Sequence, residues 1–88
     1  MIEREAKIVN PLGLHARPAA QLVKLASGFT AEIEVVKDGM SVNGKSIMGV
    51  MMLAAECGSS VMLRADGPDE QEAVNALLAL VARGFGEA

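Results

Sequence analysis

Aromatic residues are almost absent from this sequence, which has no tryptophan, no tyrosine and only two phenylalanines. Proteins that bind single-stranded nucleic acids commonly stack the bases on aromatic side chains, and they contact the phosphate backbone through lysine and arginine. This chain has 8 such basic residues against 11 acidic ones, for a formal net charge of −3. Nucleic-acid binding is therefore not expected, and the hydrophobic core must be aliphatic.

Cysteine and histidine occur only once each, as Cys57 and His15. A single cysteine cannot form an internal disulfide bond, and one histidine with one cysteine is too few for the usual zinc sites. We therefore expect no metal, no cofactor and a reducing compartment. We interpret Cys57 as a small, partly buried apolar residue.

Long hydrophobic runs are also missing. The longest run, residues 47–55, is far shorter than the roughly 20 residues that a membrane-spanning helix needs. The first five residues, MIERE, do not have the pattern of a signal peptide. A cytoplasmic protein without membrane insertion is expected.

Hydrophobic residues make up 51% of the 88-residue chain, which predicts a single folded domain over residues 1–88. The predicted strands are residues 2–9, 31–37, 40–43 and 60–66. The predicted helices are residues 16–27, 47–53 and 68–83. Asp38-Gly39 is a strong hairpin signal between two of the strands, and Pro68 is expected near the first position of the last helix. The order βαββαβα predicts an α+β fold, in which helices cover one face of an antiparallel sheet.

The segment LGLHARPAA, residues 12–20, carries the most specific chemistry. His15 is predicted at the N-cap of the 16–27 helix, where the N–H groups of Ala16 and Arg17 have no partner inside the helix. The positive end of the helix and the Arg17 guanidinium favour a bound anion, such as a phosphoryl group. Neutral imidazole is a good nucleophile, and the helix end disfavours the imidazolium. These residues predict a phosphoryl group carried on His15, but by themselves they leave open a simple capping or surface histidine.

Residues 12–19 resemble the phosphorylation-site motif of the HPr family, the phosphocarriers of the bacterial phosphoenolpyruvate:sugar phosphotransferase system. Residues 43–51, NGKSIMGVM, resemble the second motif of the same family, and the resemblance covers essentially the whole chain. It implies an open-faced sandwich, with four antiparallel strands in the order 1-4-2-3 and three helices on one face. It also implies a stoichiometric carrier that is not an enzyme in the usual sense. Nδ1 of His15 would take a phosphoryl group from enzyme I, Arg17 would stabilise it, and enzyme IIA domains would accept it.

The resemblance implies two further roles on the surface. By pattern Ser46 is an N-cap, but in some family members a dedicated kinase phosphorylates the matching serine, which makes Ser46 a candidate regulatory site. Docking of partners is expected on the first helix and the 47–53 helix. Its candidate residues are Ala20, Lys24, Ile47, Met48 and Met51. Methionine suits a surface that binds several partners, while Val50 and Leu53 are expected to face the core.

Two other functions remain open from the sequence. One is a regulatory binding module of the same fold, either in a nitrogen-type branch or as a serine-phosphorylated transcriptional co-regulator. The other is a small ligand-binding α+β domain without phosphoryl transfer. Retention of His15, Arg17 and Pro18 argues against a module that acts only through its serine, and a ligand-binding domain leaves these residues unexplained. The choice between a sugar branch and a nitrogen branch also stays open, and a monomer is the simplest expectation.

Overall fold

Strands and helices follow one another in the predicted order in the computed structural model, which describes residues 1–87. The strands are β1 (Ile2–Lys7), β2 (Glu32–Lys37), β3 (Met40–Asn43) and β4 (Ser60–Asp66). The helices are α1 (Ala16–Ala26), α2 (Ile47–Met52) and α3 (Glu70–Ala82), and a tight turn, η1 (Gly84–Gly86), follows α3. The bounds of β3 and β4 agree with the prediction.

The four strands form one antiparallel sheet in the order β1-β4-β2-β3. This confirms the strand order that the family resemblance implied. Side chains alternate across a strand, so every second residue of β4 faces the helices. These residues are Val61, Leu63 and Ala65, and all three are buried. The intervening Met62 and Arg64 point to the opposite, open face and are only half-buried.

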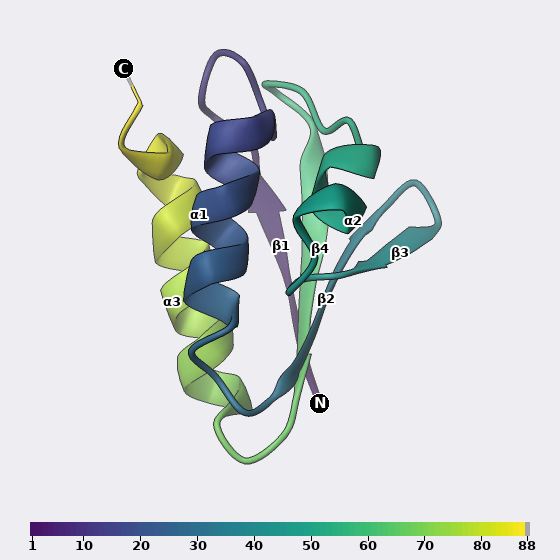
Figure 1. Cartoon of the computed structure of the whole chain (residues 1–88), viewed down its shortest axis with the longest axis vertical. Coiled ribbons are helices and arrows are strands. Elements are labelled where there is room, and N and C mark those ends of the chain that lie inside the picture. Colours follow the sequence, from purple (N-terminus) through teal and green to yellow (C-terminus); the bar gives the residue numbers. More distant parts are fainter. Residues whose placement is uncertain (88) are drawn as a thin grey trace.

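Helices α1 and α3 lie beside one another on the covered side of the sheet (Figure 1). They run in opposite directions, so α1 begins and α3 ends at the same end of the molecule (Figure 1). This arrangement brings the N-cap of α1 close to Glu87, which follows η1. Helix α2 packs against α1, and its first turn lies near β3 (Figure 1).

The core between the sheet and the helices is aliphatic, as predicted. The largest fully buried aliphatic side chains are Ile8, Leu22, Val35, Val50, Val61, Leu63, Val74, Leu77 and Val81. Of the two aromatic residues, Phe29 packs half-buried at the edge of this cluster, and Phe85 is only 3% exposed. Phe85 therefore joins the residues after α3 to the core.

Several predicted bounds need correction. Strand β1 ends at Lys7 and not at residue 9, because its pairing with β4 stops there. The backbone N–H and carbonyl of Ile8 instead form hydrogen bonds with Ser59 and Gly58, in the loop before β4. Helix α1 ends at Ala26, with Ser27 as its C-cap. Helix α2 ends at Met52, with Leu53 as its C-cap.

The prediction that Pro68 lies near the first position of the last helix is wrong. Helix α3 begins at Glu70 with Asp69 as its N-cap, so Pro68 precedes the cap. The Asp69 carboxylate accepts hydrogen bonds from the backbone N–H groups of Thr30 and Ala31, each at 2.8 Å. This link to the segment before β2 sets the start of the helix, and it depends on residues far away in the sequence.

The interpretation of Cys57 as partly buried is also wrong. Cys57 is exposed on the loop between α2 and β4. Between residues 1 and 87, no helix is long and apolar enough to cross a bilayer. Over the same residues, no three His, Cys, Asp or Glu side chains gather into a group that could hold a metal ion.

Candidate functional site

His15 is the N-cap residue of α1, as predicted. Its backbone is extended, and its carbonyl oxygen accepts the first helical hydrogen bond, from the N–H of Ala19 at 3.0 Å. Its side chain makes no capping hydrogen bond and is 36% exposed. The backbone N–H groups of Ala16 and Arg17 donate to no other group of residues 1–87. The imidazole and these free donors therefore meet at the positive end of α1.

Pro18 is tolerated at the third position of α1, because the N–H that proline lacks would have no partner there. Its ring is buried, which anchors the first turn to the core.

The loop before α1 is fixed by close contact with the segment after α2. Gly13 has φ +66°, and a Cβ at this position would collide with the carbonyl oxygen of Ala55. The N–H of Leu14 donates to that same oxygen at 2.8 Å, so the backbone on both sides of His15 is anchored.

Glu87 is a site residue that the sequence reasoning missed. His15 Nε2 lies 3.0 Å from Glu87 Oε2 and 3.3 Å from Oε1. The sequence predicts positive groups beside His15, namely the helix end and Arg17, whereas the structure adds a carboxylate. The pKa of Glu87 is lowered mainly because the Asn10 side chain donates a hydrogen bond to its carboxylate. Partial burial raises this pKa, whereas the hydrogen bond with His15 and the charges of His15 and Arg17 lower it further.

An unusual backbone carries Glu87 to this place. Gly84, Phe85 and Gly86 all have positive φ angles, of 61°, 57° and 75°. Glycine adopts this left-handed region freely, but for phenylalanine it is unfavourable, so the surrounding packing must hold it there. The burial of the Phe85 ring supplies that packing. In the sequence, only the tripeptide Gly-Phe-Gly indicates this turn, and it does not indicate a contact with His15.

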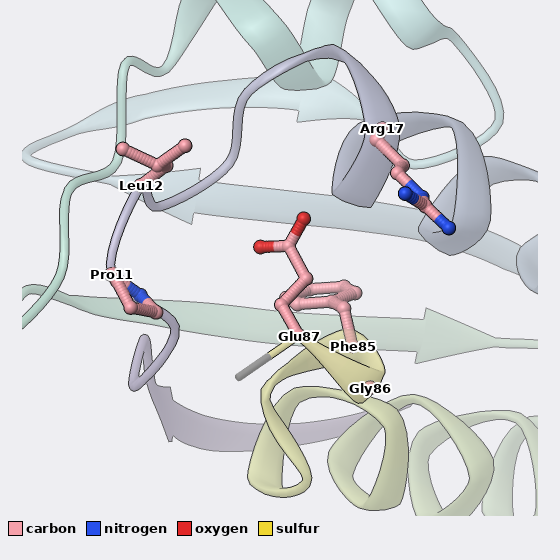
Figure 2. A pocket seen from close by; sticks show the side chains of 6 residues that line it. All are labelled: Pro11, Leu12, Arg17, Phe85, Gly86 and Glu87. Atoms are coloured by element: carbon pink, nitrogen blue, oxygen red, sulfur yellow. The ribbon is translucent and has the colours of Figure 1, made fainter.

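Arg17 and Glu87 line the same surface pocket, which has a volume of about 380 Å³ (Figure 2). The other lining residues are Pro11, Leu12, Phe85 and Gly86. In Figure 2 the Glu87 carboxylate points up from the C-terminal turn, between the Pro11-Leu12 loop and Arg17. Arg17 is exposed, and between residues 1 and 87 no carboxylate lies within 4.0 Å of its guanidinium. The guanidinium is therefore available to a ligand.

The contact with Glu87 decides which ring nitrogen of His15 can react. In a neutral imidazole, one nitrogen carries the proton and the other carries a lone pair, and hydrogen bonding selects between the two forms. A carboxylate only accepts, so Nε2 must be the nitrogen that carries the proton. The lone pair is then on Nδ1, which makes no hydrogen bond with residues 1–87. The geometry thus provides a nucleophile beside free N–H donors and a free guanidinium.

Helix α2 exposes the predicted apolar residues. Val50 and Leu53 are buried as expected, whereas Ile47, Met48 and Met51 are 44%, 77% and 42% exposed. Two further large apolar side chains, Met52 and Leu12, are exposed beside them and were not predicted. A second hollow, also of about 380 Å³, is lined by His15, Leu12, Met51 and neighbouring residues. The α2 surface is therefore continuous with His15.

The remaining candidate residues lie around this surface. Ala20 and Lys24 are exposed on α1. Ser46 is half-buried as the N-cap of α2, and its Oγ accepts a hydrogen bond from the N–H of Gly49 at 3.1 Å. This confirms the N-cap prediction for Ser46.

Comparison with known proteins gives a consistent result over nearly the whole chain. A family model described as "PTS HPr component phosphorylation site" matches residues 2–83. The chain is 56% identical over 87 residues to "Phosphocarrier protein HPr" of Cupriavidus necator, a match that covers 99% of this chain and 98% of that protein. It is 47% identical over 81 residues to "HPr-like protein Crh" of Bacillus subtilis, covering 92% of this chain and 95% of that protein. The crystal structure of HPr-C-His from Thermoanaerobacter tengcongensis superposes with a TM-score of 0.96 at 50% identity, covering 100% of this chain and 99% of that one.

Proposed function

The chain belongs to the HPr family of phosphocarriers of the phosphotransferase system, and we propose that Nδ1 of His15 is the atom that carries its phosphoryl group. The observation that carries this proposal is the state of the His15 ring at the start of α1. Nε2 is occupied by the Glu87 carboxylate, and Nδ1 is left free. A protein of this kind is a stoichiometric intermediate and not an enzyme.

The transfer is a displacement at phosphorus. The lone pair of His15 Nδ1 forms the new P–N bond, and the bond between phosphorus and the donor group breaks, with its electron pair leaving on the donor. The ring becomes positively charged as the bond forms, and the carboxylate of Glu87 stabilises that charge through Nε2–H. The phosphoryl oxygens are held by the N–H groups of Ala16 and Arg17 and by the Arg17 guanidinium. Such a reaction depends mainly on positioning and charge stabilisation, and this end of α1 offers both.

Membership of the family implies enzyme I as donor and enzyme IIA proteins as acceptors. We propose that both dock on one surface, formed by Ala20, Lys24, Ile47, Met48 and Met51. Exposed methionines adapt to different partners, and the hollow between Met51 and His15 supports a docking surface that reaches the reacting atom. Such a small surface gives transient complexes, which a carrier needs for turnover. A carrier that works as a monomer fits this scheme.

We further propose Ser46 as a regulatory site for a serine kinase and for the regulatory proteins that read its phosphate. Its Oγ already accepts the N–H of Gly49, and a phosphate would retain an acceptor for that N–H. The added negative charge would stand beside Ile47 and Met48. It would therefore weaken docking on the same surface that serves transfer.

The test is the intact mass of the protein after incubation with phosphoenolpyruvate, Mg²⁺ and enzyme I, with an acid-treated aliquot measured beside it. We expect a single phosphoryl increment that disappears in acid, because a P–N bond is labile in acid. The increment should be absent in His15→Ala, and transfer should be slower in Arg17→Ala. Transfer at the normal rate in His15→Ala would disprove the proposal.

A second function is favoured by one observation, the 47% identity to the HPr-like protein Crh. This alternative is a regulatory module that acts through Ser46 alone. It predicts no acid-labile increment with enzyme I from either the sugar or the nitrogen branch. Within residues 1–87, His15 Nδ1 makes no hydrogen bond and no carboxylate pairs with the Arg17 guanidinium, and both observations favour the phosphocarrier.

A further inference from the structure

Asn10 is a buried polar residue on the loop that leads to His15, and the residue is only 1% exposed. Burial of a primary amide is unfavourable unless the amide forms hydrogen bonds. The Asn10 Nδ2 group donates two, to the carbonyl oxygen of Gly13 at 2.7 Å and to Glu87 Oε1 at 2.9 Å. Both neighbours are acceptors, so the NH₂ group and not the oxygen must face them. Asn10 Oδ1, on the other side, is buried without a partner in residues 1–87.

The two hydrogen bonds of Asn10 join two parts of the site. The bond to Gly13 closes the turn that carries His15, together with the backbone bond from the N–H of Gly13 to the carbonyl of Asn10 at 3.1 Å. The bond to Glu87 holds a carboxylate that lies 77 positions away in the sequence. One buried amide therefore sets the position of the loop and of the carboxylate relative to one another.

The Glu87 carboxylate depends on Asn10 for its direction. Between residues 1 and 87, the hydrogen bonds of this carboxylate come from Asn10 and His15 only. Because Asn10 occupies Oε1, Oε2 is the oxygen that lies closer to His15 Nε2. Arg17 faces the same pocket and attracts the carboxylate (Figure 2). A carboxylate released from Asn10 could turn to the guanidinium and neutralise the cation that the phosphoryl group needs.

We propose that Asn10 is a positioning residue for phosphoryl transfer: through its hydrogen bond to Glu87, it holds the carboxylate on Nε2 of His15 and away from Arg17. The proposal rests on His15 as the phosphoryl acceptor. Asn10 itself touches neither the phosphoryl group nor the reacting nitrogen. Its effect is to keep the lone pair on Nδ1 and the guanidinium free.

The ring nitrogens of His15 provide a direct readout, which requires no phosphorylation. In ¹⁵N-labelled protein at mildly alkaline pH, two-bond ¹H–¹⁵N spectra distinguish a protonated from an unprotonated ring nitrogen. In the unaltered protein we expect Nε2 to have the shift of a protonated nitrogen and Nδ1 that of an unprotonated one. In Asn10→Ala the two shifts should move towards each other, as the ring relaxes to the mixture of an unrestrained imidazole. Glu87→Ala should give the same change.

The rate of transfer from phosphorylated enzyme I gives the second readout. Asn10→Ala loses two hydrogen bonds, to Gly13 and to Glu87. Loss of the one to Glu87 should change the equilibrium that positions the carboxylate by about two- to tenfold, so we expect transfer to slow by about that factor. The exposed Asn75 of α3 supplies the control, and Asn75→Ala should change neither the rate nor the ring shifts. In the double variant of Asn10 and Glu87, the rate should equal that of Glu87→Ala alone, because Asn10 acts through this carboxylate.

Two results would overturn the proposal. One is unchanged ring shifts in both single variants. The other is a full effect of Asn10→Ala in the background of Glu87→Ala, which would mean that Asn10 acts only on the loop. If Asn10→Ala does not fold, Glu87→Ala provides the test by itself. Unchanged ¹⁵N shifts of the His15 ring in that variant would overturn the proposal. Failure of the underlying function is seen separately, as the absence of phosphate on the unaltered protein.

Discussion

Replacement of Phe85 by alanine tests how the C-terminal turn serves the site. The ring is only 3% exposed, and truncation of a buried phenylalanine typically costs about 3–5 kcal/mol. Alanine keeps a Cβ, so the variant gains no relief from the left-handed backbone at φ +57°. The turn after α3 can open locally without unfolding the rest of the domain, which limits the loss of stability. We therefore expect the free energy of unfolding to fall by about 2–4 kcal/mol, below the usual value for a core phenylalanine.

The assay for Phe85→Ala combines stability with transfer. A loss of 1 kcal/mol lowers Tm by about 4–8 °C in a domain of this size, so urea titration and thermal melts will both resolve the change. Release of the turn also withdraws Glu87 from His15, so transfer should slow to the rate of Glu87→Ala at a temperature where both variants are folded. Phe29→Ala is a matched control, because Phe29 packs half-buried near the opposite end of α1. It should lower stability and leave transfer unchanged.

Either of two results would refute this reasoning about the turn. A loss of stability below about 1 kcal/mol would mean that Phe85 does not anchor the turn to the core. A normal transfer rate in a clearly destabilised Phe85→Ala protein would mean that the position of Glu87 does not depend on this anchor.

Three further predictions concern the surface and the loops. Ser46→Ala should lower the free energy of unfolding by about 1 kcal/mol, because it removes the hydrogen bond that caps Gly49. Ser46→Asp should keep this cap and slow phosphoryl transfer from enzyme I. An alanine variant as stable as the unaltered protein would argue against the cap. Met48→Asp should raise the enzyme I concentration needed for half-maximal transfer. Because Met48 is exposed, the free energy of unfolding should stay within about 0.5 kcal/mol of that of the unaltered protein. An unchanged dependence on enzyme I concentration would remove Met48 from the docking surface. The pKa of Asp69 is lowered chiefly by the hydrogen bond from the N–H of Thr30. The ionised carboxylate therefore stabilises the fold at pH values above its unfolded pKa of about 3.9. This stabilisation is lost as the pH falls through the lower pKa of the folded state. Stability should then fall less steeply with acid in Asp69→Asn than in the unaltered protein, and parallel pH profiles would contradict this.

The family resemblance implies the strand order, while the residues themselves predict the element order and the class of fold. Short sequence patterns were sufficient where hydrogen bonds join residues close in the sequence, as at the N-caps Ser46 and His15. Prediction failed where distant residues decide the local structure. The start of α3 was misplaced because Asp69 is held by Thr30 and Ala31. The prediction that Cys57 is partly buried failed because composition does not tell which way a loop residue faces.

The sequence by itself determined that a nucleophilic imidazole stands at the positive end of a helix, with Arg17 in the same turn. That follows from residues within three positions of one another, where helix geometry leaves little choice. The family resemblance implies Nδ1 as the accepting atom, but only the tertiary structure brings a carboxylate to Nε2 and so leaves Nδ1 for the lone pair. His15 and Glu87 are 72 positions apart, and they meet because α1 and α3 pack in opposite directions and because Phe85 fixes the turn after α3. Asn10 completes the contact from a third segment, and this convergence depends on packing of the whole domain.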